Sequence, residues 1–461
     1  GMKDILLVLS DQHGWAYTGF ADELLDTPNL KRIAQEGCLW ERCYCNAPLC
    51  VPSRMSFLTG LLPSELGIFN NDTTLPIDMP TIAHDLGTAG YETVLIGRMH
   101  FKGDDQNHGF DRRLAGDITS QYWGTGGKNR KDFGDFAGTS NRKHCLEAVG
   151  GGYSPVMAYD RHVMEEAETF LKENLERPGR PPLFIVVGFY GPHFPFVSDP
   201  ERYEKYKKRL AGREESGVRP ALEEYEDYLQ ECSREKRLHC QAAYYGLVET
   251  LDGYTGRLFD QFRSGEEKAG RENVFFYTSD HGEQLGKRGI FGKQTLYEDA
   301  VRVPLIAADS TKPGQNLIKQ KPLSLLQVRE MILEAVELKQ EPADRSEPVY
   351  IQQILERRGE LLMGEAALWF PYKAVRIGSR LRVYNLETDP WEEEDLAASR
   401  PEICRMAEEL FLKPEEQKQC LDRERKQRHF HERLKAWGKA KGPKEWAVMT
   451  IPEEARRKPE E

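Results

Sequence analysis

Several features that assign a chain to a class are missing from this sequence of 461 residues. It has no apolar run long enough to span a bilayer, so we expect no membrane-spanning segment. Its nine cysteines include no CxxC pair and no zinc-like spacing, so neither a disulfide framework nor a zinc module is expected. The formal net charge is −11, whereas a surface that follows nucleic-acid phosphates is normally basic. No repeat or low-complexity tract is present. We therefore expect a globular chain with no nucleic-acid or membrane partner.

We also expect no targeting signal at the start of the chain. The residues Met2-Lys3-Asp4 lead directly into the apolar run Ile5–Leu9, with no signal-peptide hydrophobic region or cleavage site. We therefore expect a cytoplasmic location.

What the sequence does contain is a regular alternation of short apolar runs and helical patterns. The runs 5–10, 93–96, 183–189 and 274–279 are typical of buried strands, and helical patterns cover 30–35, 81–87, 162–174 and 242–262. This order predicts an α/β fold with a large, mainly parallel sheet sandwiched by helices. Ligands of such sheets collect at the carboxyl ends of the strands. The residues placed just past predicted strand ends are Asp11, His100, His193 and Asp280.

The pattern changes near residue 342, which suggests two parts. Residues 1–341 form the predicted catalytic α/β domain, with a charged helical insertion at about 199–240. Residues 342–461 contain short alternating runs and a turn at Asp389-Pro390, which predict a smaller C-terminal α+β subdomain with an antiparallel sheet and a helical, frayed tail. The basic run Arg423–Arg428 is interpreted as a helix surface.

The run Cys50-Val51-Pro52-Ser53-Arg54 combines a thiol, a turn-forming proline and an arginine at the start of a predicted helix that ends at Gly60. Ser53 can cap this helix, and the thiol of Cys50 would lie beside free N–H groups at the positive end of the helix dipole. The guanidinium of Arg54 is suited to an oxyanion. The alternative is a structural thiol buried in the core.

Residues 46–60, Asn-Ala-Pro-Leu-Cys-Val-Pro-Ser-Arg-Met-Ser-Phe-Leu-Thr-Gly, resemble the signature of type I sulfatases of the alkaline phosphatase superfamily. The resemblance implies an alkaline phosphatase-like fold and oxidation of Cys50 to formylglycine by a maturing enzyme. It covers about the first two thirds of the chain, in the family's order. The further matches are Ser10-Asp11-Gln12, Gly97–His100, Gly191–Phe196, Ser279–Glu283, and Lys293 with the segment that follows it.

The resemblance also implies a divalent metal beside residue 50. The predicted ligands are Asp11, Gln12, Asp280 and His281, together with the modified Cys50. Oxygen ligands favour Ca²⁺ or Mg²⁺ over thiophilic metals. The family often has a second aspartate where this chain has Gln12, which removes a charge but leaves an amide oxygen. By the same resemblance, hydrated formylglycine attacks sulfur.

Four further side chains are expected around the sulfate group. Lys293 can neutralise its charge, His193 can bind it or protonate the leaving oxygen, and His100 can activate or orient the nucleophile. Arg98 stands where the family usually has lysine, so its positive charge has a different geometry. Taken singly, each histidine has an alternative interpretation as a satisfied core residue.

The preferred function is hydrolysis of a small sulfate monoester. One alternative is a phosphonate or phosphate ester hydrolase of the same superfamily, and another is a catalytically silent sulfate-ester binding protein. Residues 97–111 resemble the corresponding segment of choline sulfatases, so choline sulfate is one candidate substrate and a sulfated mono- or disaccharide is the other. A quaternary ammonium would need aromatic faces and a carboxylate. The candidates for those are Trp15, Tyr17, Trp123, Asp104 and Asp105.

Overall fold

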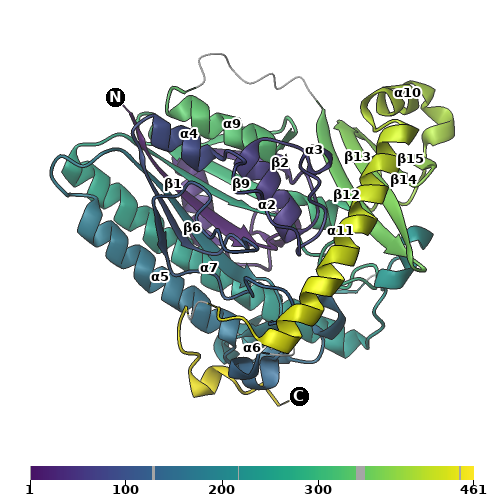
Figure 1. Cartoon of the computed structure of the whole chain (residues 1–461), viewed down its shortest axis with the longest axis horizontal. Helices are drawn as coiled ribbons and strands as arrows, with labels where there is room; N and C mark the ends of the chain where they lie inside the picture. Colours follow the sequence, from purple (N-terminus) through teal and green to yellow (C-terminus); the bar gives the residue numbers. More distant parts are fainter. Residues whose placement is uncertain (1, 127–129, 216, 339–347, 446–447, 461) are drawn as a thin grey trace.

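A large mixed sheet forms the centre of the computed structural model (Figure 1), which describes residues 2–126, 130–215, 217–338, 348–445 and 448–460. Its strands follow the order β10-β2-β9-β8-β1-β6-β3-β4, with β11 paired to β2. Among the described strands of this sheet, β9 is antiparallel to its neighbours and the other pairs are parallel. The strands are β1 (Asp4–Asp11), β2 (Cys38–Tyr44), β3 (Glu92–Gly97), β4 (Arg112–Leu114), β6 (Leu183–Pro192), β8 (Asn273–Ser279), β9 (Arg302–Asp309), β10 (Leu317–Lys319) and β11 (Leu323–Ser324). The predicted mainly parallel sheet is confirmed.

Strand β1 shows why helices must cover both faces of this sheet. Its side chains alternate, so that Ile5 and Leu7 belong to one hydrophobic cluster and Leu6 and Val8 to another. The first cluster is completed by helices α2 (Cys50–Thr59), α4 (Ile82–Thr88) and α9 (Leu325–Ala335). The second is completed by helices α1 (Pro28–Glu36), α5 (Pro155–Asn174) and α7 (Arg234–Ala269). Figure 1 shows α2, α4 and α9 on one side of the sheet and α5 and α7 on the other.

The charged stretch at about 199–240, predicted as a helical insertion in the catalytic domain, contains two helices that bury part of their surface. Helix α6 (Pro200–Ala211) buries Tyr203, Tyr206 and Leu210, and helix α7 starts at Arg234 and continues without a break through residue 240. The charges of α6 lie on its outer face, whereas its three buried residues, spaced three and four apart, pack inward beside α7. Between the two helices lies the 3₁₀ turn η5 (Glu223–Tyr228). A two-stranded sheet of β5 (Val149–Gly151) and β7 (Phe196–Ser198) lies beside them.

The C-terminal part contains the predicted small antiparallel sheet. Its strands are β12 (Val349–Arg357), β13 (Glu360–Trp369), β14 (Tyr372–Ile377) and β15 (Arg380–Asn385). The predicted domain boundary at 341/342 lies outside the described residues. Val349 and Ile351 of the small sheet share a hydrophobic cluster with α9, so the two sheets are joined by a common core.

Two helices, α10 (Pro401–Leu410) and α11 (Pro414–Lys441), follow the small sheet. Helix α11 is continuous, and Figure 1 shows it extending from the small sheet toward the end of the molecule where α6 lies. Beyond it, Ile451 and Ala455 are buried in the cluster that contains α5. The last part of the chain therefore packs back onto the main sheet's helices.

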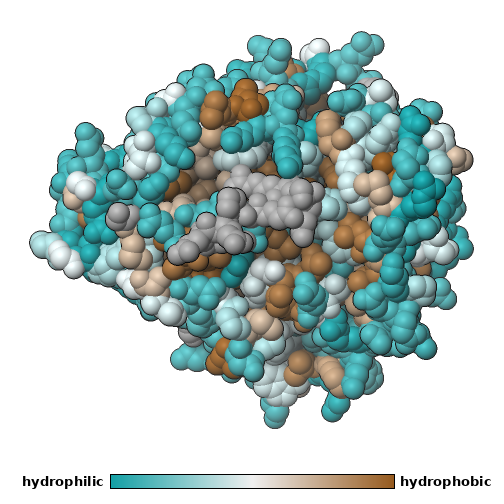
Figure 2. Space-filling model, turned by 90° about the horizontal axis from the view of Figure 1, so that it is seen from above, coloured by the Kyte–Doolittle hydropathy of each residue, from teal (hydrophilic) through white to brown (hydrophobic). Residues whose placement is uncertain are grey.

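The face shown in Figure 2 is mainly hydrophilic, with hydrophobic residues in small separate groups. Within the described residues, no helix is both long and apolar enough to cross a membrane. All nine thiols are free.

Candidate active site

Cys50 is the first residue of helix α2, at the carboxyl edge of the main sheet. Leu49 precedes the helix in an extended conformation, and Gly60 ends it with a φ of 78°, as predicted. Ser53 is not the predicted cap. It lies inside the first turn, where its hydroxyl donates to the carbonyl oxygen of Asp280 over 2.6 Å. Ser53 therefore links α2 to the end of β8 by a hydrogen bond. At the start of the same helix, the Cys50 side chain is buried, with 1% of its surface exposed.

Four of the predicted metal ligands, one of which is Cys50, lie close together. One donor atom from each of Asp11, Cys50, Asp280 and His281 lies within 4.8 Å of the others, and all four side chains are buried. The Cys50 Sγ is 3.5 Å from both Asp11 oxygens and 3.1 Å from His281 Nε2. The other ring nitrogen of His281, Nδ1, is 3.0 Å from the Gly282 carbonyl, which can only accept a hydrogen bond. Nδ1 therefore carries the proton and leaves Nε2 as a lone-pair donor, as metal-ligating histidines require. This donor set fits a small divalent cation.

Arg54 contacts the carboxylates of Asp11 and Asp280, and it does not line the cavity that opens above Cys50. Its Nη2 donates to Asp11 over 3.1 Å and its Nε to Asp280 over 2.9 Å. Arg98 donates to the same Asp11 oxygen over 2.6 Å. Burial alone would raise the pKa of Asp11, but Arg98 and Arg54 together hold that pKa well below its usual range. Arg54 therefore holds the carboxylates of Asp11 and Asp280 in position. The sequence had instead predicted that its guanidinium contacts an oxyanion.

Lys293 joins two other predicted site residues, Gln12 and His193. Its Nζ donates to Gln12 Oε1 over 2.6 Å and lies 2.9 Å from His193 Nε2. The Nδ1 of His193 is 2.6 Å from the Phe194 carbonyl, so Nδ1 bears the proton and Nε2 accepts from the ammonium group. Burial, and then the charge of Lys293, lower the pKa of His193 well below its usual range. A neutral imidazole and an ammonium group therefore stand side by side.

Glu283 fixes the orientation of the Gln12 amide. Its Oε1 accepts from Gln12 Nε2 over 2.8 Å, while its Oε2 accepts from the backbone N–H of Leu285 over 2.7 Å and of Gly292 over 2.5 Å. Burial raises the pKa of Glu283, and these hydrogen bonds oppose that shift. Because a carboxylate only accepts, the Gln12 oxygen must face the other way, toward Lys293.

His100 is held by Arg98 and by a carboxylate that the sequence did not single out, Asp117. The Asp117 side chain accepts from the backbone N–H of His100 over 2.7 Å and of Met99 over 3.1 Å, and it pairs with Arg98 over 3.1 Å. Arg98 Nη2 lies 3.1 Å from His100 Nδ1, and since a guanidinium only donates, Nδ1 accepts. Burial and Arg98 lower the pKa of His100 well below its usual range. His100 is therefore neutral, with its proton on Nε2.

The thiol of Cys50 is protonated in this setting. Burial, and then the nearby charge of Asp11, raise its pKa to about 12. A protonated, buried thiol is a weak nucleophile.

A cavity of about 630 Å³ opens above Cys50. It brings together five of the predicted site residues, namely Cys50, Arg98, His100, His193 and Lys293. The remaining five are buried and do not line it; these are Asp11, Gln12, Arg54, Asp280 and His281. The site therefore has a buried carboxylate layer and a group of cations and imidazoles that face the cavity.

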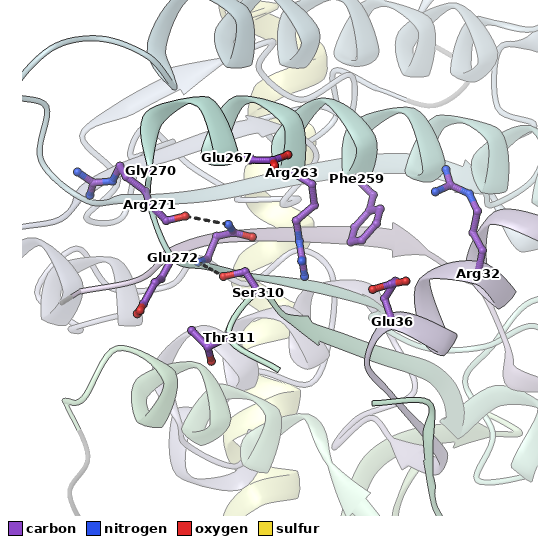
Figure 3. A pocket seen from close by; sticks show the side chains of 11 residues that line it. Arg32, Glu36, Phe259, Arg263, Glu267, Gly270, Arg271, Glu272, Ser310 and Thr311 are labelled. Carbon is purple, nitrogen blue, oxygen red and sulfur yellow. Dashed lines mark hydrogen bonds between the residues drawn. The ribbon is translucent and has the colours of Figure 1, made fainter. Parts of the chain in front are cut away.

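A larger hollow, of about 800 Å³, contains none of these residues. Figure 3 shows it beside the end of α7 at Gly270, with Arg263, Glu36 and Arg32 among its side chains. Asn273, the first residue of β8, also lines it, so it lies at the amino edge of the sheet. Ligands of such sheets bind at the opposite edge, which is where Cys50 lies.

Sequence reasoning did not assign roles to Glu283 and Asp117. Glu283 belongs to the quoted run Ser279–Glu283, so its place after a strand end was a usable signal. Asp117 follows the short strand β4, and no local pattern connects it to Arg98 or His100. Long-range contacts of this kind can be read only from the fold.

The chain belongs to the sulfatase family, whose sequence model matches residues 3–337. This family hydrolyses sulfate esters, so the predicted enzyme class and family are confirmed. The predicted alkaline phosphatase-like fold is confirmed as well, because solved proteins of that superfamily share the fold over most of the chain.

Relatives of known activity include a choline-sulfatase from Rhizobium meliloti, 31% identical over 442 residues that cover 88% of this chain and 83% of the relative. An arylsulfatase from Clostridium perfringens is 27% identical and covers 69% of this chain and 70% of its own length. The fold is shared with a phosphonate monoester hydrolase of Agrobacterium radiobacter, at a TM-score of 0.67, 18% identity and coverage of 88% of this chain and 94% of that one. It is also shared with a protein solved with its substrate D-glucosamine-2-N,6-O-disulfate, at a TM-score of 0.68, 20% identity and coverage of 89% and 97%.

Proposed function

We propose that this chain hydrolyses a small sulfate monoester, using Cys50 after conversion to formylglycine and one Ca²⁺ or Mg²⁺. The observation that carries the proposal is the convergence of Asp11, Cys50, Asp280 and His281 directly beneath the cavity. Gln12 would add an amide oxygen to these ligands. When bound, the cation would supply positive charge against the sulfate oxygens and acidify a hydroxyl group at residue 50.

The charges of the buried layer support an anionic substrate. Asp11 and Asp280 are balanced by Arg54 and Arg98, to which they are paired. Among the described residues no carboxylate pairs with Lys293, whose Nζ is hydrogen-bonded to Gln12 and His193 and adds positive charge beside the cavity. Such preorganised charge stabilises the negative charge of a sulfate group during transfer.

The two histidines have separate roles in this proposal. His193 and Lys293 share a hydrogen bond, so the pair holds a proton beside the position of the ester oxygen and can donate it to the leaving alcohol. His100 presents its Nε2–H to the cavity, because Arg98 occupies its Nδ1, and it would orient the nucleophile at residue 50. Conversion of Cys50 would replace the weakly nucleophilic thiol by the hydroxyl group of a hydrated aldehyde.

The test compares matched leaving groups. Protein produced together with a formylglycine-generating enzyme is assayed with 4-nitrophenyl sulfate, 4-nitrophenyl phosphate and a 4-nitrophenyl phosphonate monoester. We expect the sulfate to have the highest kcat/KM. A higher value for the phosphonate or the phosphate would favour the alternative hydrolase, and no turnover of any ester would favour a silent binding protein.

The role of Cys50 is checked in the same preparation. The peptide that contains it should carry an aldehyde, and Cys50→Ala should lose turnover. Cys404→Ala, which removes another free thiol in helix α10, is the matched control and should keep activity. Loss in both variants would contradict a specific role for Cys50. The maturing enzyme as a partner and the cytoplasmic location stay predictions.

A further inference from the structure

The cavity above Cys50 is rich in cations, although the whole chain carries a net charge of −11. Arg98 and Lys293 belong to the sulfate site. The cations that line the rest of the cavity are Lys102, Arg130, Arg142, Lys143, Lys435 and Lys439. Among the described residues that line it, Asp72 is the one carboxylate. A cavity with this lining attracts anions and repels cations.

Half of these cations already have partners within the protein. Arg130 pairs with Asp132 at 2.7 Å, and Lys435 pairs with Asp72 at 3.2 Å. Lys102 donates to two backbone carbonyls, and its ammonium lies 4.0 Å from Asp72. The single carboxylate of the cavity is thus shared by two lysines and is not available to a cationic ligand.

The other three cations have no carboxylate partner in the described part of the chain. Arg142 stacks on Tyr228, and its buried Nε makes no hydrogen bond. A Cβ atom added at Gly292 would lie 3.9 Å from Arg142 Cδ. Because Gly292 directly precedes Lys293, Arg142 lies close to the part of the sulfate site that Lys293 forms. Lys143, beside it, is exposed. Lys439 lies across the cavity on helix α11.

Helix α11 is held in place by a close backbone contact. A Cβ atom at Gly438 would lie 1.6 Å from the carbonyl oxygen of Trp123, so only glycine permits this approach. Lys435 and Lys439 are four residues apart and share one face of the helix, which here is the face toward the cavity. Lys435 and Lys439 of helix α11 therefore form one fixed, positively charged side of the cavity, which we call the basic wall.

The aromatic rings that the sequence offered for binding a quaternary ammonium group already contact cations of the protein itself. Cationic side chains of the protein lie over Trp15, Tyr17 and Trp123, at 5.0, 4.7 and 5.8 Å from the ring centres. None of these three rings lines the cavity. Asp104 hydrogen-bonds to Tyr122, and neither it nor Asp105 lines the cavity.

We propose that Arg142, Lys143 and Lys439 form a subsite for a second anionic group of the substrate. The substrate is then a sulfate ester whose released alcohol carries a carboxylate or a further sulfate group, as in an acidic sulfated sugar. This inference rests on the proposed sulfatase function. It disfavours choline sulfate, whose cationic head would face this wall.

The experiment uses aryl sulfates of matched shape. In 3- and 4-sulfooxybenzoate the ring bears a carboxylate; the corresponding benzamides are isosteric and neutral, and the trimethylammonio phenyl sulfates are cationic. We expect kcat/KM to be about tenfold higher for a carboxylate than for its benzamide, a typical effect of one charge-assisted contact. The benzamide has the better leaving group, so chemical reactivity alone would give the opposite order.

Variants then assign the preference to the subsite. Lys143→Ser with Lys439→Ser should bring the carboxylate-to-benzamide ratio close to one. Lys441→Ser removes a lysine of the same helix that does not line the cavity, so the ratio should persist. Equal rates for the wild-type protein, or faster cleavage of the cationic ester, would overturn the subsite while the sulfatase function stands. If no aryl sulfate were cleaved, the proposed function itself would fail.

Discussion

Glu283 provides a sharp test of how the site is built, because its exchange for glutamine changes hydrogen-bond polarity at nearly constant shape. One carboxylate oxygen accepts two backbone N–H groups and the other accepts the Gln12 amide. In Glu283→Gln the new amide must keep its oxygen toward the two backbone donors. Its NH₂ group then faces the NH₂ group of Gln12. If Gln12 turns over to avoid this, its own NH₂ group meets the ammonium of Lys293.

Either arrangement leaves a buried donor without an acceptor. Such a group costs about 1–3 kcal/mol. If that cost falls on the orientation of Lys293 toward the sulfate group, kcat/KM should decrease about ten- to a hundredfold, at about 1.4 kcal/mol for each factor of ten. The measurement is kcat/KM for 4-nitrophenyl sulfate with the matured protein.

A second variant separates hydrogen-bond polarity from general damage. Gln12→Glu combined with Glu283→Gln exchanges acceptor and donor and keeps the net charge, so residue 12 now accepts from both neighbours and no buried donor is left without an acceptor. We expect this double variant to be more active than Glu283→Gln alone. Glu360→Gln, at the exposed start of β13, is the control. Wild-type activity in Glu283→Gln, or a double variant below the single one, would refute the reasoning.

Further outcomes follow from the same geometry. Chelation should inactivate the protein and Ca²⁺ or Mg²⁺ should restore it; activity that survives exhaustive chelation would argue against the metal. Asp280→Ala should lose bound metal, as measured by elemental analysis, and should unfold at lower temperature because Arg54 is left without one of its two carboxylates. Burial and neighbouring cations lower the pKa of His100 and His193 well below 6.5, so both are neutral above that pH; kcat/KM should stay level from pH 7 to 6 and fall only in more acid solution, whereas a midpoint at 6.5 or higher would contradict the assignment. Gly438→Ala should weaken the docking of α11 and raise KM with little change in kcat for a small aryl sulfate; an unchanged melting temperature would show that the contact with residue 123 is not tight.

The sequence predicted the sheet and the place of the site because both depend on local patterns. Continuous apolar runs such as 183–189 identify buried strands, and the residues that follow them must meet at one edge of a parallel sheet. That rule alone brought Asp11, His100, His193 and Asp280 together. The convergence of their side chains needed no knowledge of distant contacts.

Other features could not be predicted because they depend on packing between distant segments. Arg54 was expected at an oxyanion, since nothing local shows that two buried carboxylates would claim its guanidinium. Ser53 was expected to cap a helix that begins three residues earlier. The basic wall of α11 was hidden as well, because its charges resemble those of any solvated helix until Gly438 is seen against Trp123.

Helix α11 also lies in a different part of the chain from the residues of the sulfate centre. Every residue of the sulfate centre, and the subsite residues Arg142 and Lys143, lie within the span that the family model matches, residues 3–337, whereas Lys435 and Lys439 lie beyond it. In this proposal, the cleavage of the ester bond is encoded within that span, whereas one part of the recognition of the alcohol is encoded in helix α11. Grafting the corresponding helix from a relative onto this catalytic core offers a route to a new substrate range that leaves the chemistry intact, and drift in the C-terminal segment could diversify such enzymes in the same way.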